Sequence, residues 1–557
     1  MKLNGSEILL ECLLEQGVDT VFGYPGGSVL NIYDALYKYS DKITHILTAH
    51  EQGACHAADG YARSSGKTGV VIATSGPGAT NLVTGIATAY MDSIPLVAIT
   101  GNVSVNLLGL DSFQEVDIAG ITMPVTKHNY IVKDIRELAD TVREAFYIAN
   151  EGRKGPVLID IPKDVTANFC EYTRKQPLEI ENETEIEPER LAEAVRLIQK
   201  AKRPFIYTGG GVILSDAADE VREFVDRSGG VVSSSLMGQG GFDNTDPRYM
   251  GMLGMHGTKT ASLAITECDL FVGIGTRFSD RVIGDIKSFA PNADIIHIDI
   301  DSSEIDKNIK SGYQLIGDLK QILPMLSERL QKLEHPEWLA QIAAWKKQYP
   351  LRQVGKTPDE VLPQDVIETL ERLTDGDAII ATEVGQHQMW AAQFFNFRRP
   401  HQFVSSGGLG TMGFGFGAAI GSKVANPDKT VVNIAGDGSF HMNLNELVTI
   451  SKYQIPVIEL VFNNNVLGMV RQWQKLFYDK RFSQTTLERP TDYQMLGKAF
   501  GVNAMTIAHK SEIEPVLKQA LSCGKPVLIE CKIDRDINVL PMVPPGGSIA
   551  EPILELD

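Results

Sequence analysis

Short apolar runs, each bounded by glycine or a polar turn, alternate with helical patterns along almost the whole chain. Runs that are apolar at nearly every position are typical of strands buried on both faces, because a half-exposed strand would alternate apolar with polar residues. Strands separated by helices form parallel sheets with helices on both faces. The sequence therefore predicts an α/β protein. The runs are residues 69–74, 95–100, 156–161, 204–209, 269–275, 293–300, 377–382, 430–436 and 456–462.

Two polar stretches with few strand signals interrupt this alternation, at residues 171–190 and 346–364. The first is acidic and the second is rich in proline, and both are typical of linkers. They divide the 557 residues into segments of ordinary domain size, and a hydrophobic content of 43% is ample for several cores. We predict three domains, at 1–170, 191–345 and 365–557.

The formal net charge of −18 argues against binding to nucleic-acid phosphates, which needs a basic surface. Small anions are compatible with this charge, because backbone N–H groups at helix starts bind them. The six cysteines include no CxxC pair, which favours isolated thiols in a reducing compartment over a zinc site or a disulfide framework. The sequence has no signal-peptide pattern and no apolar run of bilayer length. We expect a soluble, cytoplasmic protein with no nucleic-acid or membrane partner.

An acid and a run of amides follow two consecutive predicted strands. Asp437 lies in a Gly-Asp-Gly turn after the first, and three asparagines at 463–465 follow the next. If the strands are neighbours, both groups lie at one sheet edge, where ligands of parallel sheets bind. Hard oxygen ligands suit Mg²⁺ or Ca²⁺, and phosphate oxygens commonly complete the shell of Mg²⁺. The alternative is that these residues only form turns or helix caps. Asn463 and Asn464 compete for the ligand position.

A GxGxxG pattern at Gly408, Gly410 and Gly413 suggests a different ligand, a dinucleotide whose ribose Asp428 would bind. The glycine-rich stretch continues past this pattern, and the Gly-Asp-Gly turn follows it. We therefore favour a loop that lines the same ligand as Asp437.

Glu51 lies in the sequence His-Glu-Gln-Gly-Ala, where a strand is expected to end and a helix to begin. By itself, it is an ordinary first-turn acid favoured by the helix dipole. Two glycine-rich loops flank it in the sequence, GYPGG at 23–27 and SGPGATN at 75–81.

These motifs together, GYPGG, HEQGA, SGPGATN and then GDGSF followed by NN, resemble those of the thiamine diphosphate-dependent enzymes. Longer segments narrow the resemblance to the catalytic subunits of biosynthetic acetohydroxyacid (acetolactate) synthases, and it covers essentially the whole chain. These segments are residues 113–130, 251–259, 275–284, 406–421, 468–478 and 541–547.

The resemblance implies a pyrimidine-binding domain (1–170), a central FAD-binding domain (191–345) and a diphosphate- and metal-binding domain with a C-terminal lid (365–557). It implies that pyruvate is decarboxylated on thiamine diphosphate and that the hydroxyethyl enamine condenses with a second 2-keto acid. Pyruvate then gives 2-acetolactate and 2-ketobutyrate gives 2-aceto-2-hydroxybutyrate, the first common step of branched-chain amino acid biosynthesis.

The cofactors implied are thiamine diphosphate, Mg²⁺ and a flavin without a redox role. The assembly implied is a homodimer or homotetramer in which two chains share each cofactor, with a separate regulatory small subunit.

The resemblance also assigns roles to single residues. Glu51 protonates the pyrimidine of the cofactor and should lie in a dry, mostly apolar pocket. Arg277 recognises the carboxylate of the acceptor, and Trp473 lines the pocket for its alkyl group. The catalytic positions are Glu51, Gln114, Lys127, Arg277 and Trp473, with Phe113 beside the substrate channel. The metal ligands are Asp437, Asn464 and the main-chain oxygen of Val466.

Two further sets of contacts are implied. The thiamine diphosphate contacts are Tyr24, Pro25, Gly26, Glu51, Pro77, Asn81, Val384, Gly385, Gln386, His387, Gly410, Met412, Gly438, Ser439, Leu467, Gly468 and Met469. The FAD contacts are Arg153, Gly209, Gly210, Gly211, Met255, His256, Gly257, Thr258, Gly275, Arg277, Asp299, Ile300 and Asp318.

The chain departs from the pattern of the family at two positions. Glu383 stands where most members of the nearest subfamily have aspartate. Ser279 interrupts the usual RFDDR sequence near the flavin. Three alternative functions are a flavin-dependent pyruvate oxidase, a glyoxylate carboligase and a nucleotide-binding module without turnover. Trp473 counts against the first and Glu51 against the second, whereas the intact motifs count against the third.

Overall fold

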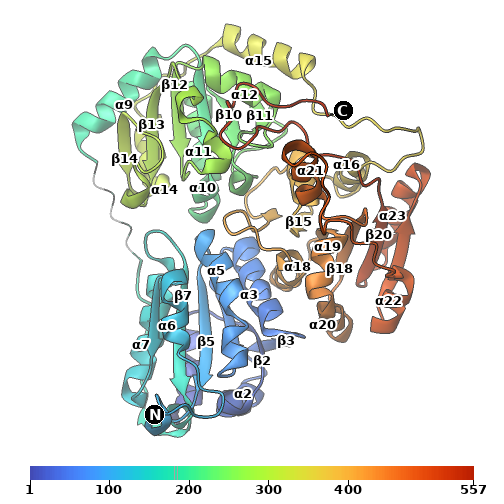
Figure 1. The fold of residues 1–557 in the computed structure, drawn as a ribbon. Helices are drawn as coiled ribbons and strands as arrows, with labels where there is room; N and C mark the ends of the chain where they lie inside the picture. Colours follow the sequence, from blue (N-terminus) through green and yellow to red (C-terminus); the bar gives the residue numbers. More distant parts are fainter. Residues whose placement is uncertain (181, 183, 185, 557) are drawn as a thin grey trace.

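The computed structural model describes residues 1–180, 182, 184 and 186–556, which form three α/β domains (Figure 1). Each domain is built on one six-stranded sheet whose strands all run parallel. Helices cover both faces of each sheet in Figure 1. The predicted fold class is therefore confirmed.

The first domain has the strand order β3-β2-β4-β5-β7-β6. Its central strands β4, β5 and β7 are buried at every residue, as expected from their continuous apolar sequence. The strands are β2 Thr20–Tyr24, β3 Thr44–Leu47, β4 Gly69–Ala73, β5 Leu96–Asn102, β6 His128–Ile131 and β7 Pro156–Pro162, with the antiparallel pair β1 Lys2–Asn4 and β8 Phe169–Glu171. The helices are α1 Gly5–Glu15, α2 Leu30–Lys38, α3 Glu51–Ser65, α4 Pro77–Thr80, α5 Val83–Met91, α6 Ile118–Thr122, α7 Ile135–Asn150 and α8 Lys163–Ala167.

The second domain has the strand order β11-β10-β9-β12-β13-β14. Strands β9 and β12 at its centre are again buried throughout. The strands are β9 Pro204–Thr208, β10 Val231–Ser234, β11 Tyr249–Met252, β12 Leu270–Ile274, β13 Asp294–Asp299 and β14 Tyr313–Ile316. The helices are α9 Pro188–Lys200, α10 Gly210–Leu214, α11 Ala218–Ser228, α12 Lys259–Glu267, α13 Asp280–Ile283, α14 Leu319–Ser327 and α15 Pro336–Gln348.

The third domain has the strand order β16-β15-β17-β18-β20-β19, so β17 and β18 are neighbours. The strands are β15 Ile379–Thr382, β16 Phe403–Val404, β17 Val431–Gly436, β18 Val457–Asn463, β19 Asn503–Ile507 and β20 Val527–Lys532. The helices are α16 Pro363–Leu373, α17 Gln386–Phe394, α18 Phe414–Ala425, α19 Asp437–Asn443, α20 Leu447–Tyr453, α21 Gly468–Phe477, α22 Tyr493–Phe500 and α23 Ile513–Ser522.

The predicted linkers are longer than the observed ones. Strand β8 ends at Glu171 and Tyr172 is buried in the core of the first domain, so this domain extends past residue 170. Helix α9 begins at Pro188, inside the predicted linker 171–190. Residues 181, 183 and 185 of that stretch lie outside the described residues. The second linker is likewise shortened, because α15 ends at Gln348 and α16 begins at Pro363.

Helices α3 and α18 join the first and third domains in close contact. A Cβ atom on Gly421 would lie 1.8 Å from the carbonyl oxygen of Ala57, and one on Gly60 would lie 2.1 Å from that of Ala418. Only glycine at these positions permits the two helices to approach so closely.

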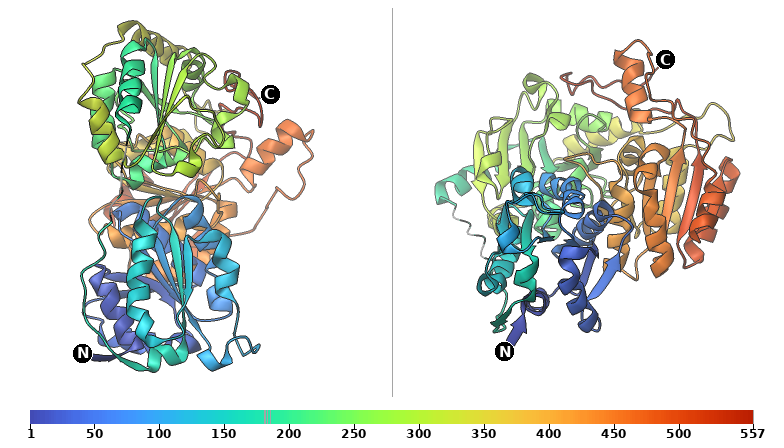
Figure 2. Two further views of the ribbon diagram at one scale, coloured as in Figure 1. Left: turned by 90° about the vertical axis from the view of Figure 1, so that its left-hand side faces the viewer. Right: turned by 60° about the horizontal axis from the view of Figure 1, so that its bottom comes forward.

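The C-terminal segment leaves the third domain and crosses to the second (Figure 1). The backbone N–H of Val543 donates to the oxygen of Met255 at 2.8 Å, and that of Asp285 donates to the oxygen of Gly547 at 2.9 Å. Helix α21 projects beside this segment (Figure 2). No helix among the described residues is both long and apolar enough to cross a bilayer.

Candidate active site

Asp437 and Asn464 meet at the carboxyl edge of the third sheet. Strands β17 and β18 are paired in register up to Gly436 and Phe462, so the residues that follow them lie side by side. Burial raises the pKa of the Asp437 carboxyl to about 6, whereas the neighbouring backbone N–H groups, including those of Gly438 and Asn464, act to lower it. The two strand ends therefore converge as the sequence predicted.

The structure separates the two asparagines that compete for this corner. The amide of Asn463 donates to Oε1 of Glu530 on β20 at 2.7 Å and is thus engaged with the neighbouring strand. The amide oxygen of Asn464 instead accepts from the backbone N–H of Val466 at 3.1 Å, next to Asp437. Asn464 therefore lies beside Asp437, whereas the side chain of Asn463 faces β20.

Two side chains at the start of α17 lie beside this corner, and each carries one buried polar atom without a partner among the described residues. Oε1 of Gln386 and Nε2 of His387 are both buried and accept or donate no hydrogen bond among the described residues. A Cβ atom on Gly436 would lie 2.7 Å from the His387 ring, and one on Gly468 would lie 2.0 Å from Oε1 of Gln386. A ligand or a water molecule can pair with such buried polar atoms.

Glu383 binds the start of α18 and the Gly-Asp-Gly turn. Its carboxylate accepts from the backbone N–H of Gly413 at 2.6 Å, from that of Phe416 at 3.1 Å and from the hydroxyl of Ser439 at 2.7 Å. Burial raises its pKa to about 7, against the effect of these donors. The glutamate that departs from the family pattern therefore ties the start of α18 to the Gly-Asp-Gly turn.

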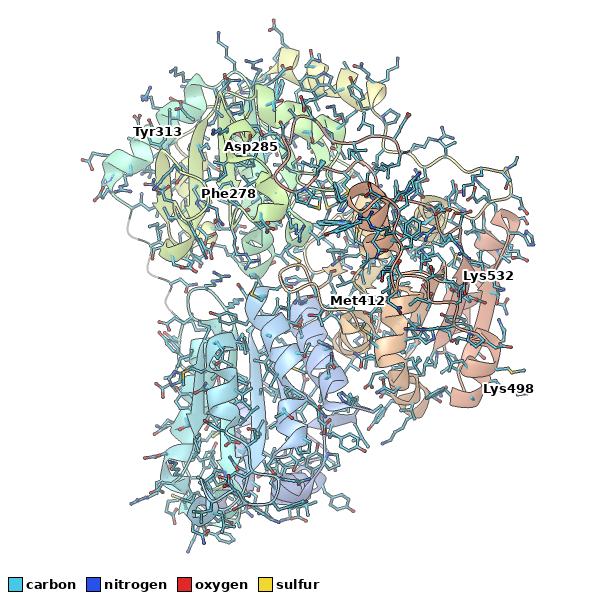
Figure 3. All side chains as sticks on the ribbon, viewed as in Figure 1. Phe278, Asp285, Tyr313, Met412, Lys498 and Lys532 are labelled. Atoms are coloured by element: carbon cyan, nitrogen blue, oxygen red, sulfur yellow. The ribbon has the colours of Figure 1, made fainter. Side chains whose placement is uncertain are left out.

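Met412 lies in the loop between β16 and α18, at the edge of the third domain that faces the other two (Figure 3). Gly410 and Gly413 on either side of it have φ of +68° and +87°, which glycine adopts without strain. The dinucleotide interpretation of these glycines is not supported, because Asp428 precedes β17 and so lies at the amino end of the sheet.

Glu51 begins α3 at the end of β3, as predicted. Its Oε2 accepts from the amide of Asn81 at 3.0 Å, and a Cβ atom on Gly78 would lie 3.3 Å from its other oxygen. The loops around it pack closely, since a Cβ atom on Gly26 would lie 2.5 Å from the side chain of Thr74. Glu51 is only partly buried in this chain, so the expected dry pocket is not formed by the single chain.

The remaining predicted residues of the first domain differ in their surroundings. The side chain of Phe113 is 87% exposed, and Gln114 adopts φ of +59° beside Gly76. The ammonium of Lys127 donates to the oxygen of Glu151 at 2.7 Å and to that of Ile148, at the end of α7. Lys127 thus caps the end of α7, and none of its hydrogen bonds is to Asp437 or Glu51.

A pocket of about 950 Å³ opens where the three domains meet. This volume is at the upper end for small-molecule sites, which suits an extended ligand. Thr258 does not line the pocket, contrary to its assignment, because its hydroxyl caps α12 and donates to the oxygen of Met250. The predicted flavin contacts that do line it are Arg153, Gly209, Gly210, Gly211, Met255, His256, Gly257, Gly275, Arg277, Asp299, Ile300 and Asp318.

Comparison with known proteins places this geometry in a family. Three models of thiamine pyrophosphate enzymes match, the N-terminal TPP binding domain at residues 3–121, the central domain at 191–326 and the C-terminal TPP binding domain at 383–531. The acetolactate synthase isozyme 2 large subunit of Escherichia coli (strain K12) is 44% identical over 100% of both chains. The large subunit of Porphyra purpurea is 45% identical, over 99% of this chain and 95% of its own. A probable large subunit of Methanocaldococcus jannaschii is 47% identical, over 99% and 96%.

The chain belongs to the acetolactate synthase large subunits. Each matched model falls on one of the three sheets, although the N-terminal model ends before β6 and β7 and the C-terminal model begins after β15. The resemblance stated from the motifs is confirmed.

Two arginines of the family segment GTRFSDR have different environments. Arg277, predicted to bind the acceptor, is turned towards the first domain, where its guanidinium donates to the oxygen of Met91 at 2.9 Å. Arg281, which the sequence analysis did not single out, lies over the ring of Trp473 at 5.7 Å from its centroid. Both Arg281 and Trp473 line the large pocket. The prediction from sequence therefore overlooked Arg281, the second arginine of this segment.

The described residues fit the cofactors of the family to different degrees. Nε2 of His387 suits a diphosphate as a donor in one tautomer, whereas Oε1 of Gln386 can only accept. The Asp437 corner offers oxygen ligands for Mg²⁺. Gly211 and Gly275 pack closely at the wall of the large pocket, since a Cβ atom on Gly211 would lie 2.7 Å from Cα of Gly275, and this contact requires glycine.

Proposed function

We propose that this chain is the catalytic subunit of an acetolactate synthase, which condenses pyruvate with a second 2-keto acid after decarboxylation. One observation carries the proposal beyond the family. Arg281 and Trp473 form a cationic and a flat apolar surface at the same pocket, which suits an acceptor with a carboxylate and a short alkyl group.

Bound thiamine diphosphate would supply the carbon chemistry, as an electron sink for the carbon that loses CO₂. Asp437, Asn464 and the main-chain oxygen of Val466 would hold Mg²⁺ against the diphosphate, with Gln386 and His387 beside it. Glu51 would hold the proton at N1′ of the pyrimidine. Arg281, rather than Arg277, is the better-placed group for the carboxylate of the acceptor. FAD would occupy the large pocket without a redox role, and α21 with the C-terminal segment would exclude water.

The assembly that fits this proposal is a homodimer or homotetramer in which each cofactor lies between two chains. The partial exposure of Glu51 and the high exposure of Phe113 support it, because a partner would cover both. The six free cysteines are consistent with the cytoplasm, where thiols stay reduced. A regulatory small subunit would bind outside the site.

Incubation with pyruvate, thiamine diphosphate, Mg²⁺ and FAD tests the proposed reaction. We expect 2-acetolactate as the product, identified by mass and by its decarboxylation to acetoin in acid. Acetyl phosphate with hydrogen peroxide, formed in phosphate buffer, would instead identify a pyruvate oxidase. Cofactor binding without any product would leave a binding module.

Replacing Trp473 with leucine should reduce the preference for 2-ketobutyrate over pyruvate. The flat ring contacts the extra methylene, which is worth about 0.8 kcal/mol, or about fourfold in the product ratio. The ratio is measured with both keto acids in competition. Phe477 is a matched control, because its ring packs against Trp473 on the same helix but does not line the pocket. An unchanged ratio in Trp473→Leu would remove this residue from the acceptor site.

A further inference from the structure

The loop between β16 and α18 is rich in glycine, and one hydrogen bond within it joins the N–H of Thr411 to the hydroxyl of Ser406 at 3.1 Å. It contains Gly407, Gly408, Gly410 and Gly413, and glycine has more backbone freedom to lose than any other residue. Met412 must nevertheless be fixed if it supports a cofactor ring. Side chains outside the loop add to the constraint on its shape.

Asp92 supplies that constraint from the first domain. It follows α5, and its Oδ1 accepts from the backbone N–H of Gly408 at 2.7 Å while its Oδ2 accepts from that of Gly407 at 3.0 Å. The Asp92 side chain is 1% exposed. One buried carboxylate thus binds two consecutive N–H groups of another domain, which are charge-assisted hydrogen bonds.

Arg63 completes the contact. Its Nη2 donates to Oδ2 of Asp92 at 3.0 Å, and its Nη1 donates to the oxygen of Ser405, at the start of the loop, at 2.8 Å. Its guanidinium also binds Asp59 and lies 5.1 Å from the centroid of the Phe414 ring, where α18 begins. Arg63 is therefore paired with two carboxylates, of which only Asp92 touches the loop.

Helix α5 makes a second contact with the loop, at Thr411, the residue directly before Met412. The hydroxyl of Thr88 on α5 donates to the oxygen of Thr84 at 2.8 Å, so the hydroxyl of Thr411, 2.7 Å away, is the donor to Thr88. On the other side of Met412, the N–H of Gly413 is held by Glu383 of the third domain. The residue before Met412 is therefore bonded to the first domain, and the residue after it is bonded to Glu383 of the third domain.

We propose that Asp92 is a positioning residue for catalysis, which, together with Thr88, holds the loop 405–413 so that Met412 is presented to the cofactor. The proposal rests on the proposed function only in that thiamine diphosphate binds beside Met412. The end of α5 is then a clamp that links the packing of the first domain to the shape of the cofactor site in the third.

The test compares Asp92→Asn with Asp59→Asn at saturating FAD. Both substitutions remove one carboxylate partner of the same buried arginine, but only the first weakens the bonds to the loop. We expect the Kd of thiamine diphosphate in Asp92→Asn to rise by at least about tenfold, since a hydrogen bond to a charged group contributes enough for that factor. We also expect slower exchange of the C2 proton of bound cofactor. Asp59→Asn should change thermal stability similarly and leave both quantities near the wild-type values.

Thr88→Val keeps the test decisive if Asp92→Asn does not fold. It removes the acceptor for Thr411, and we expect a rise in Kd of about threefold. Its control is Thr122→Val, a buried threonine on α6 whose hydroxyl donates only to its own helix, to the oxygens of Ile118 and Ala119. Equal effects in each variant and its control, or no change in Kd and exchange, would refute the clamp. Neither readout uses acetolactate, so a different product would overturn the proposed function and leave this inference standing.

Discussion

Glu51→Gln is expected to bind thiamine diphosphate normally while the exchange of its C2 proton slows by orders of magnitude. Glutamine keeps the shape of the side chain and can still accept from the amide of Asn81. It has no acidic proton to share with the pyrimidine, and removing a positioned acid or base typically costs about 10²–10⁴-fold. Binding is measured by titration, and exchange by quenching in D₂O followed by NMR.

The control for Glu51→Gln is Glu137→Gln, because Glu137 is an exposed first-turn acid of α7 in the same domain. If Glu51 acted only on the helix dipole, both substitutions would have the same small effect. An exchange rate in Glu51→Gln equal to that of the wild type would remove this residue from catalysis.

Asp437→Ala is expected to abolish the binding of thiamine diphosphate and of Mg²⁺ together. In the proposed function Asp437 would hold Mg²⁺ beside the diphosphate, so the affinity for each ligand would depend on the other. We expect losses on the order of 100-fold or more, measured by titrating each ligand in the presence of the other. Asn464→Ala should behave similarly, whereas Asn463→Ala should be mild because its amide binds Glu530. The opposite result would shift the metal ligands by one residue.

The Glu51→Gln and Asp437→Ala variants together test whether two chains share each cofactor site. Glu51→Gln and Asp437→Ala chains, each inactive alone, should regain activity when they are mixed under conditions that permit exchange. A mixed dimer has one site with both lesions and one with none, and about half of randomly formed dimers are mixed. If mass measurements show exchange while activity stays at the level of the single variants, each site is built within one chain.

Local sequence patterns determined much of this protein. The continuous apolar runs identified the central strands β4, β7, β12 and β17, because a strand buried on both faces is apolar at nearly every position. The spacing of Asp437 and Asn464 placed them at one sheet edge, since one crossover helix joins neighbouring parallel strands. The ends of the linkers were predicted less accurately than the strands. Tyr172 is buried in the core, and its polar neighbours in the sequence do not reveal this burial.

Only the tertiary structure decided which side chains far apart in the sequence meet. Asn463 and Asn464 are equivalent in sequence, but the pairing of β18 with β20 brings Asn463 to Glu530. Likewise, Arg281 rather than Arg277 meets Trp473. Asp92 lies 315 residues from Gly407, and the pattern of neither segment indicates the other. Periodicity and turn chemistry depend on neighbours in the chain, whereas these contacts depend on how whole sheets and helices pack against one another.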